Sequence, residues 1–154
     1  ITLDTWHLYT TTYTAATKTI NFYMDGVFQG SSTSALYDAS FTLTSNPAIL
    51  SGSFVDSFPF PVIYDRKVRT FWAATWNSVL TPTEITYLYS GVGASGWNSF
   101  DLKTNAGSYA SASSLKHWWR PGDGNLGNDE VSGGISLSGV NINIGTDIVV
   151  DSPA

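Results

Sequence analysis

Two histidines and one pair of adjacent acids are the residues of this chain whose types could do chemistry. His7 and His117 each lie near a tryptophan in a segment whose residues alternate as they do in a β-strand. Zinc sites take their ligands mainly from several cysteines and histidines, and the chain has no cysteine and no third histidine. We therefore expect both histidines to have structural roles.

The acidic residues do not form the arrangement that glycoside hydrolysis needs. That reaction uses two carboxyl groups about 5–10 Å apart on either side of the scissile bond. Asp129-Glu130 is the only adjacent acidic pair, and neighbours on a strand point to opposite faces. Gly127 and the residues 132–134 favour a loop at this place. We expect no catalytic residues in the chain.

Calcium is the alternative at two short stretches rich in side-chain oxygen, because this ion accepts carboxylate and carbonyl ligands. The stretches are Asp123-Gly124-Asn125 and Asn128-Asp129-Glu130. Neither has the alternating acids and the final glutamate of an EF-hand loop. We expect ordinary turn chemistry at both, and no other cofactor.

Aromatic rings beside polar groups are the remaining candidates for binding, because a ring face can stack on the apolar face of a sugar. The candidates are Trp97-Asn98, Trp118-Trp119 and Tyr109. Trp118 and Trp119 alternate, so at least one should lie in the core, and the other could pack in a subunit interface. The sequence does not assign a carbohydrate contact to any one of them.

Composition favours one all-β domain without nucleic-acid or membrane partners. The chain has 154 residues, of which 42% are hydrophobic and only 12% are charged. Its net charge of −5 argues against phosphate binding, and we interpret Arg66, Lys67 and Arg69 as a solvated strand end. Without cysteine there is no disulfide, and no apolar run approaches the ~20 residues that span a bilayer.

The strongest local signal is a helix that begins at Pro82. Thr81 is suited to the N-cap and Glu84 to the third helical position, so the two can form a capping box. Leu80 and Ile85 are spaced for a hydrophobic staple across this end. Gly91 is suited to end the helix after about two turns. Such a helix should close one end of a sheet.

Short alternating segments separated by turn residues predict the strands. The sequence from Ile20 to Met24 runs into Asp25-Gly26, which indicates a type I′ hairpin turn and makes Asp25 a turn residue. We interpret 29–34 as a loop and 54–61 as an ordered loop. Residues 57–61 should lie at an edge or outside the sheet, since proline removes a donor from it. The predicted strands are 6–13, 20–24, 27–28, 35–44, 48–50, 62–64 and 68–76.

The amino-acid composition of the chain changes after the predicted helix. Residues 91–96 resemble a linker of glycine and serine, and 104–114 are nearly all small and polar. Strand-like sequence resumes at Leu115 and meets a tight turn at 121–124. Residues 135–150 alternate apolar residues with glycines and predict thin strands or an extended arm.

Three stretches in order resemble a known superfamily. They are Trp6-His7-Leu8, the run from Ile20 to Gly26, and the run from Trp76 to Ile85 followed by Leu88-Tyr89. This arrangement is similar to the laminin G-like, concanavalin A-like lectin and glucanase superfamily over about residues 5–91. The resemblance implies a jelly-roll sandwich of two antiparallel sheets with one short helix near 82–90.

The end of the chain resembles a particular group within that superfamily. The runs from Leu115 to Gly124 and from Asp147 to Pro153 are similar to the C-terminal parts of laminin G-like virion proteins of tailed bacteriophages, particularly marine ones. The first run also resembles the opening strand of an ordinary laminin G-like domain. The resemblance divides the chain into the later part of a sandwich (1–91), a connection (92–114), and strands or an arm that complete it or contact a neighbouring subunit (115–154).

The sequence departs from the superfamily at two places. Phe71 and Trp72 stand where many members have acids before Trp76-Asn77, so a metal role at this point is not expected. We also expect the front half of the sandwich to precede Trp6, outside this sequence. A half-sandwich exposes an apolar face, which we expect the missing half, residues 97–154 or a neighbouring subunit to cover.

These observations favour a non-catalytic decoration, fibre or attachment domain of a phage particle, with other virion proteins and copies of itself as partners. Host surface glycans are a further possible contact. The alternatives are a free extracellular lectin-like module and, less favoured, a glucan hydrolase whose acids lie upstream.

Overall fold

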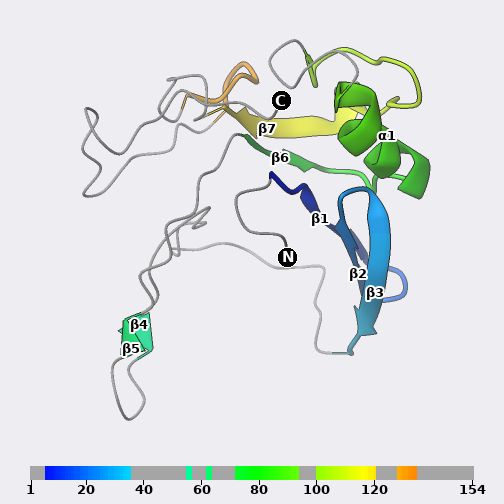
Figure 1. The fold of residues 1–154 in the computed structure, drawn as a ribbon, viewed down its shortest axis with the longest axis vertical. Helices are drawn as coiled ribbons and strands as arrows, with labels where there is room; N and C mark the ends of the chain where they lie inside the picture. The colour runs from blue at the N-terminus through cyan, green and yellow to red at the C-terminus, as the bar shows by residue number, and fades with distance from the viewer. Residues whose placement is uncertain are drawn as a thin grey trace.

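The structure is a computed structural model that describes residues 6–35, 55–56, 62–63, 72–93, 100–120 and 128–134 (Figure 1). Antiparallel strands make up most of its regular structure, with one α-helix and one short 3-10 helix, as an all-β chain predicts. The strands are β1 (Tyr9–Thr14), β2 (Thr19–Met24), β3 (Val27–Thr33), β4 (Val55–Asp56), β5 (Val62–Ile63), β6 (Ala73–Trp76) and β7 (Leu115–Trp119). The helices are α1 (Pro82–Gly93) and the 3-10 turn η1 (Ala112–Ser114).

The predicted hairpin is confirmed. β2 and β3 pair antiparallel around Asp25 and Gly26, whose φ angles of +54° and +78° are the two left-handed positions of a type I′ turn. Glycine adopts this backbone freely, and aspartate tolerates it. β1 pairs with the other edge of β2, so these three strands form one sheet in the order β1-β2-β3.

The prediction of a loop over 29–34 is wrong, because β3 continues to Thr33. Serine, threonine and glycine have weak strand signals, but β2 supplies a partner for each residue from Gly30 to Thr33. Thr33 pairs with Thr19, and their hydroxyls share a hydrogen bond of 2.9 Å. A β-bulge beside Phe22 accommodates the irregular step in this ladder.

The second sheet joins two segments that are far apart in the chain. β6 pairs antiparallel with β7, with Ala73 opposite Trp119 and Thr75 opposite His117. The Asn77 amide continues the contact by donating to the Ser114 carbonyl at 2.9 Å. The strand predicted to resume at Leu115 is therefore present and belongs beside β6.

The start of α1 has the predicted capping box. The Thr81 amide donates to Glu84 Oε2 at 2.8 Å, and the Glu84 amide donates to Thr81 Oγ1 at 3.2 Å. The predicted end is wrong: α1 passes through Gly91 and ends at Gly93 after 12 residues. Glycine is compatible with right-handed helical backbone, so its presence did not force a stop.

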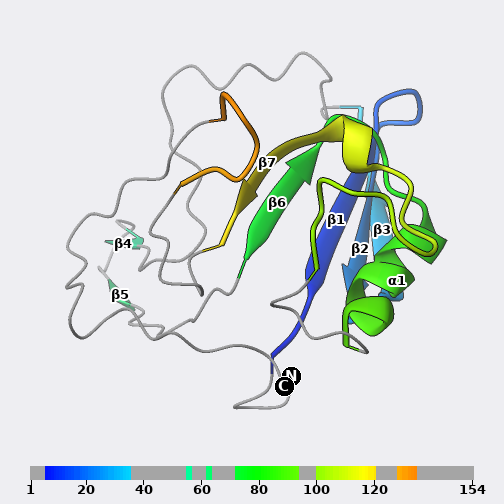
Figure 2. The same ribbon diagram turned by 90° about the horizontal axis from the view of Figure 1, so that it is seen from above.

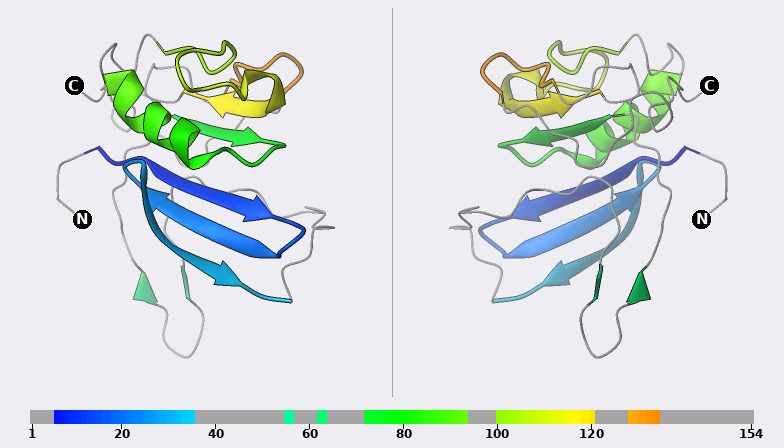
Figure 3. Two further views of the ribbon diagram at one scale, coloured as in Figure 1. Left: turned by 90° about the vertical axis from the view of Figure 1, so that its right-hand side faces the viewer. Right: turned by 90° about the vertical axis from the view of Figure 1, so that its left-hand side faces the viewer.

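The β6–β7 sheet and the β1–β2–β3 sheet lie edge beside edge, in the spatial order β7, β6, β1, β2, β3 (Figures 2 and 3). α1 covers one face of this arrangement (Figures 2 and 3). β2, β7, α1 and the segments beside them contribute buried residues to one apolar core. Its buried members are Leu8, Tyr23, Leu80, Ile85, Leu88, Leu102, Tyr109, Leu115 and Trp118. The staple residues Leu80 and Ile85 are both in this core, and so are Leu102 and Tyr109 from the segment between α1 and β7.

The turn between β2 and β3 docks directly on α1. The Thr86 hydroxyl donates to the Gly26 carbonyl at 3.0 Å. A Cβ atom on Gly26 would lie 3.0 Å from the Thr86 Cα and 3.3 Å from the Tyr89 Cβ. Glycine is thus required at this position by the close approach as well as by the turn.

Several predictions fall outside the described residues. They are most of the strand over 35–44, the segments 48–50 and 57–61, the part of the 68–76 strand before Trp72, the linker from residue 94, the turn at 121–124, and 135–150. β5 lies within the predicted strand 62–64, but its partner β4 falls in the stretch 54–61 that was predicted to be a loop. Within the described ranges no helix is long and apolar enough to cross a bilayer.

Candidate functional site

His7 is fixed by the turn residue Asp25. A hydrogen bond of 2.7 Å joins His7 Nδ1 to Asp25 Oδ2, and the Leu8 amide donates to Oδ1 of the same carboxylate at 2.9 Å. In return, the Asp25 amide donates to the Leu8 carbonyl at 2.9 Å. This set of bonds holds the segment before β1 against the β2–β3 turn.

His117 is fixed in the same way by Asp129. His117 Nδ1 lies 2.6 Å from Asp129 Oδ2, and the Trp118 amide donates to Oδ1 at 2.9 Å. The Glu130 amide donates back to the Trp118 carbonyl at 2.8 Å. A similar arrangement of three hydrogen bonds therefore occurs at two places, and we call these the His7–Asp25 clamp and the His117–Asp129 clamp.

Asp129 is the more buried of the two acids, with a side chain that is 2% exposed. Burial raises the pKa of this carboxyl, but the hydrogen bonds from the Trp118 and Val131 amides and from His117 outweigh it and lower the pKa. The bond from the Val131 amide, two residues on, is the predicted turn chemistry and confirms it for Asp129. The stretch 123–125 lies outside the described residues.

Each clamp uses its histidine as a structural group, as expected. The His117 ring also stacks on Trp119, with centroids 5.1 Å apart and planes at 7°. Across the described residues no group of three or more His, Asp or Glu side chains gathers to hold a metal. The sequence signal for both clamps was a histidine at the start of an apolar strand with an aspartate in a later turn.

Both carboxylate oxygens of a third acid, Glu84, accept hydrogen bonds from other residues of the chain. Oε2 accepts from the amide and hydroxyl of Thr81, at 2.8 and 2.9 Å. Oε1 accepts from the Ala110 amide at 3.1 Å and from the Ser111 hydroxyl at 2.5 Å. Burial raises the pKa of this carboxyl, but the four donors outweigh it and lower the pKa. Glu84 therefore ties the start of α1 to the segment before η1.

The aromatic residues proposed as sugar platforms are mostly in the core. Trp118, Trp119 and Tyr109 are 4%, 8% and 1% exposed, so none presents a free ring face. This confirms that at least one of the two adjacent tryptophans is a core residue. Lys103 and Arg120 lie within 5.8 and 5.1 Å of the Trp118 ring centroid and complete its cover. Trp97 and Asn98 lie outside the described residues.

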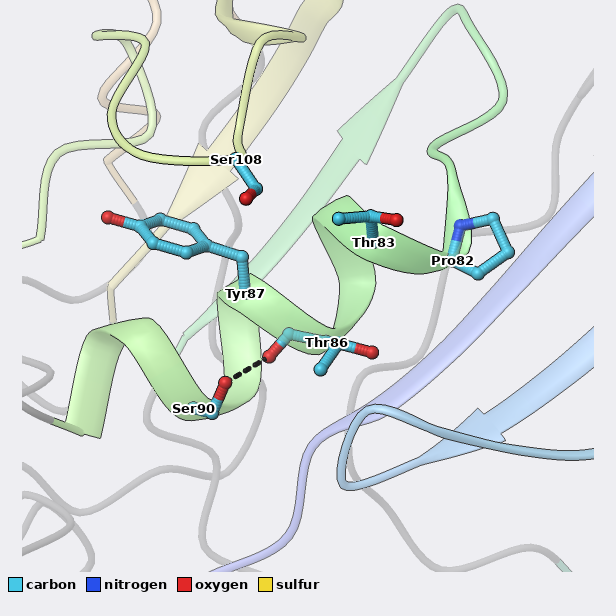
Figure 4. A pocket seen from close by; sticks show the side chains of 6 residues that line it. All are labelled: Pro82, Thr83, Thr86, Tyr87, Ser90 and Ser108. Carbon is cyan, nitrogen blue, oxygen red and sulfur yellow. Dashed lines mark hydrogen bonds between the residues drawn. The ribbon is translucent and has the colours of Figure 1, made fainter.

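A hollow of about 350 Å³ lies between the outer face of α1 and the loop that carries Ser108 (Figure 4). Its lining consists of hydroxyl side chains, a proline and one aromatic ring: Pro82, Thr83, Thr86, Tyr87, Ser90 and Ser108. The sequence analysis missed this site, although its signal is present. Positions 83, 86, 87 and 90 have the spacing of one helical face, and all four carry hydroxyl groups.

No protein-family profile, curated protein or solved structure matches this chain.

Proposed function

We propose that this chain is a non-catalytic structural or attachment domain of a bacteriophage virion protein, built as a laminin G-like jelly-roll sandwich. The observation that carries the proposal is the role of the acids. Asp25, Glu84 and Asp129 each accept backbone amide hydrogen bonds that join separate segments. Carboxylates engaged in this way stabilise a scaffold, and they are not free to act as acid and base on a substrate.

The resemblance of three motifs to laminin G-like domains supports the sandwich. In the described part, the Trp6-His7-Leu8 motif leads into β1, the Asp-Gly motif forms the β2–β3 turn, and the third motif is β6 with α1. The antiparallel pairing is compatible with a jelly roll. The virion location follows from the resemblance of the C-terminal part to phage proteins.

Contacts with copies of the chain and with other virion proteins are part of the proposal. Met24 of β2 pairs with Tyr9 of β1 on one side and with Val27 of β3 on the other. Phe22 is two residues before Met24 and lies on the same face of the sheet. This face points away from the buried Tyr23, and Tyr9, Phe22 and Val27 are 60%, 42% and 61% exposed. Light scattering on a sizing column measures the assembly; a monomer at all concentrations would refute self-association.

Mass spectrometry of purified particles tests the location. Virions of the phage that encodes the chain should contain its peptides after density-gradient purification, in a fixed ratio to the capsid protein. Antibody labelling under the electron microscope would then show whether the chain lies on the head or the tail. Particles that lack the chain would refute the proposal.

A free lectin-like module is the second candidate, and the hollow on α1 favours it. Neutral hydroxyl groups around an aromatic ring are the surface that sugars contact in small-molecule sites. A glycan array probed with the labelled protein distinguishes this candidate: it predicts binding in a protein that is absent from virions.

A further inference from the structure

We propose that the hollow on α1 binds an uncharged sugar residue of a surface glycan. The inference rests on the glycan-contact part of the proposed function and names its site and its ligand class. Three features of the hollow carry it: a fixed aromatic ring, hydroxyl groups with free hydrogen-bonding capacity, and a lining without charge.

The aromatic ring of the hollow belongs to Tyr87 and is held in place from behind. Its centroid lies 6.2 Å from that of Phe100, and Phe100 in turn lies 6.0 Å from the buried Tyr109. The loop approaches so closely that a Cβ atom on Gly107 would clash with the Tyr87 ring. Gly107 has a φ of +53°, so this position favours glycine for two reasons. A ring fixed in this way loses little freedom when a ligand binds.

The hydroxyl groups have complementary capacity for the hydroxyls of a sugar. Thr86 donates to the Gly26 carbonyl at 3.0 Å, and Ser90 donates to the Thr86 carbonyl at 2.8 Å. Their protons are therefore engaged, and their lone pairs remain as acceptors. Thr83 and Ser108 have no hydrogen-bond partner among the described residues and can donate as well as accept.

The absence of charge in the lining selects the ligand class. None of the six lining residues is ionisable near neutral pH, so an anionic or cationic sugar would gain no partner there. The volume of about 350 Å³ is at the lower end of the range for small-molecule sites. It suits one sugar residue, and the open side leaves room for the rest of a glycan chain.

Amide NMR with neutral disaccharides tests the site. The probes are lactose, maltose, cellobiose and N,N′-diacetylchitobiose at up to about 20 mM, a concentration that would nearly saturate a site with a dissociation constant of about 1 mM. At least one probe should shift the amides of residues 82–90 and 107–109 and saturate. Sialyllactose should bind no more tightly than lactose.

Variants in the hollow separate binding from folding. Tyr87→Phe keeps the ring and should bind within about twofold, while Tyr87→Ala should weaken binding about tenfold. Because Tyr87→Ala also removes packing against Phe100, Ser108→Gln provides a second test: it fills the hollow from the loop and should abolish the shifts in a folded protein. Tyr9→Ala, which changes an exposed tyrosine outside the hollow, should bind as the wild type does.

Three results would overturn the inference: no shift with any probe, shifts confined to other parts of the chain, or saturable shifts that survive both Tyr87→Ala and Ser108→Gln. Virion incorporation is measured separately by mass spectrometry. A chain found in particles with an inert hollow would retain the structural function and lose only this site.

Discussion

Replacement of Glu84 by glutamine tests whether acids in this domain act as structural joints. Glutamine keeps the size of the side chain but offers one oxygen where glutamate offers two. Its amide group would then face either the Thr81 amide or the Ala110 amide, both of which now donate to Glu84. Hydroxyl groups of Thr81 and Ser111 can rotate to accept a bond, but a backbone amide cannot.

The cost of Glu84→Gln follows from these contacts. One partly buried amide without an acceptor costs about 1–3 kcal/mol, and the remaining bonds lose the extra strength of a charged acceptor, about 1 kcal/mol in total. Glu84 is 5% exposed, so water does not replace the lost partner easily. We expect the free energy of unfolding to fall by about 2–4 kcal/mol.

Urea unfolding at neutral pH, followed by tryptophan fluorescence, measures this difference. The slope with urea should not change, since the same surface is exposed on unfolding. Glu130→Gln is the comparison variant, because it makes the same chemical change at the chain's other glutamate, which is less buried than Glu84, and it should cost less than Glu84→Gln. If Glu84→Gln costs no more than this control, the argument that the acid joins α1 to the segment before η1 is wrong.

The wild type and Glu84→Gln should also differ in how their stability depends on pH. The pKa of Glu84 is lower in the folded state than its ordinary value of 4.5. Its contribution is therefore fully present above that value and is lost as the pH falls through the folded pKa. The difference in stability between the wild type and Glu84→Gln should shrink as the pH falls below about 4.5. A difference that stays constant down to the folded pKa would contradict the lowered pKa.

Two further substitutions test other joints. Asp129→Asn places the new side-chain amide group opposite either His117 or two backbone amides. We expect it to reduce the free energy of unfolding, measured in urea at neutral pH, by about 2–3 kcal/mol. An unchanged midpoint would show that the His117–Asp129 clamp is not needed for stability. Gly26→Ala introduces a side chain at positive φ and 3.0 Å from Thr86, and should lower the thermal midpoint more than Gly133→Ala. Gly133 has a similar φ of +79° but open space around it, so equal shifts would show that contact with α1 has no effect.

The helix and the hairpin were predictable because their signals lie within a few residues. Thr81 and Glu84 are three positions apart, and the chemistry of a capping box is complete within that distance. Asp25 and Gly26 are adjacent, and each prefers the backbone that the turn requires. The other bonds of Glu84 were not predictable, because they join it to residues 26 and 27 positions later.

The errors share a physical cause, which is pairing that overrides local preference. The segment from Gln29 to Thr33 has the composition of a loop and becomes a strand because β2 lies beside it. Gly91 has the signal of a helix end, but α1 continues two residues beyond it. The hollow was missed because its residues are ordinary on a solvent-facing helix, and the loop with Ser108 completes it only in the folded chain.

The three acidic joints explain how a domain without cysteine connects distant segments. Asp25 connects the start of β1 to the β2–β3 turn, Asp129 connects β7 to the loop at 129–131, and Glu84 connects α1 to the segment before η1. β1 and β7 lie on either side of β6, so the two clamps hold the strands that flank it (Figure 2). A reducing agent cannot break these joints, whereas acid removes the charge from each. The described core should therefore keep its stability under reduction and lose it in acid, where Glu84 and Asp129 take up protons.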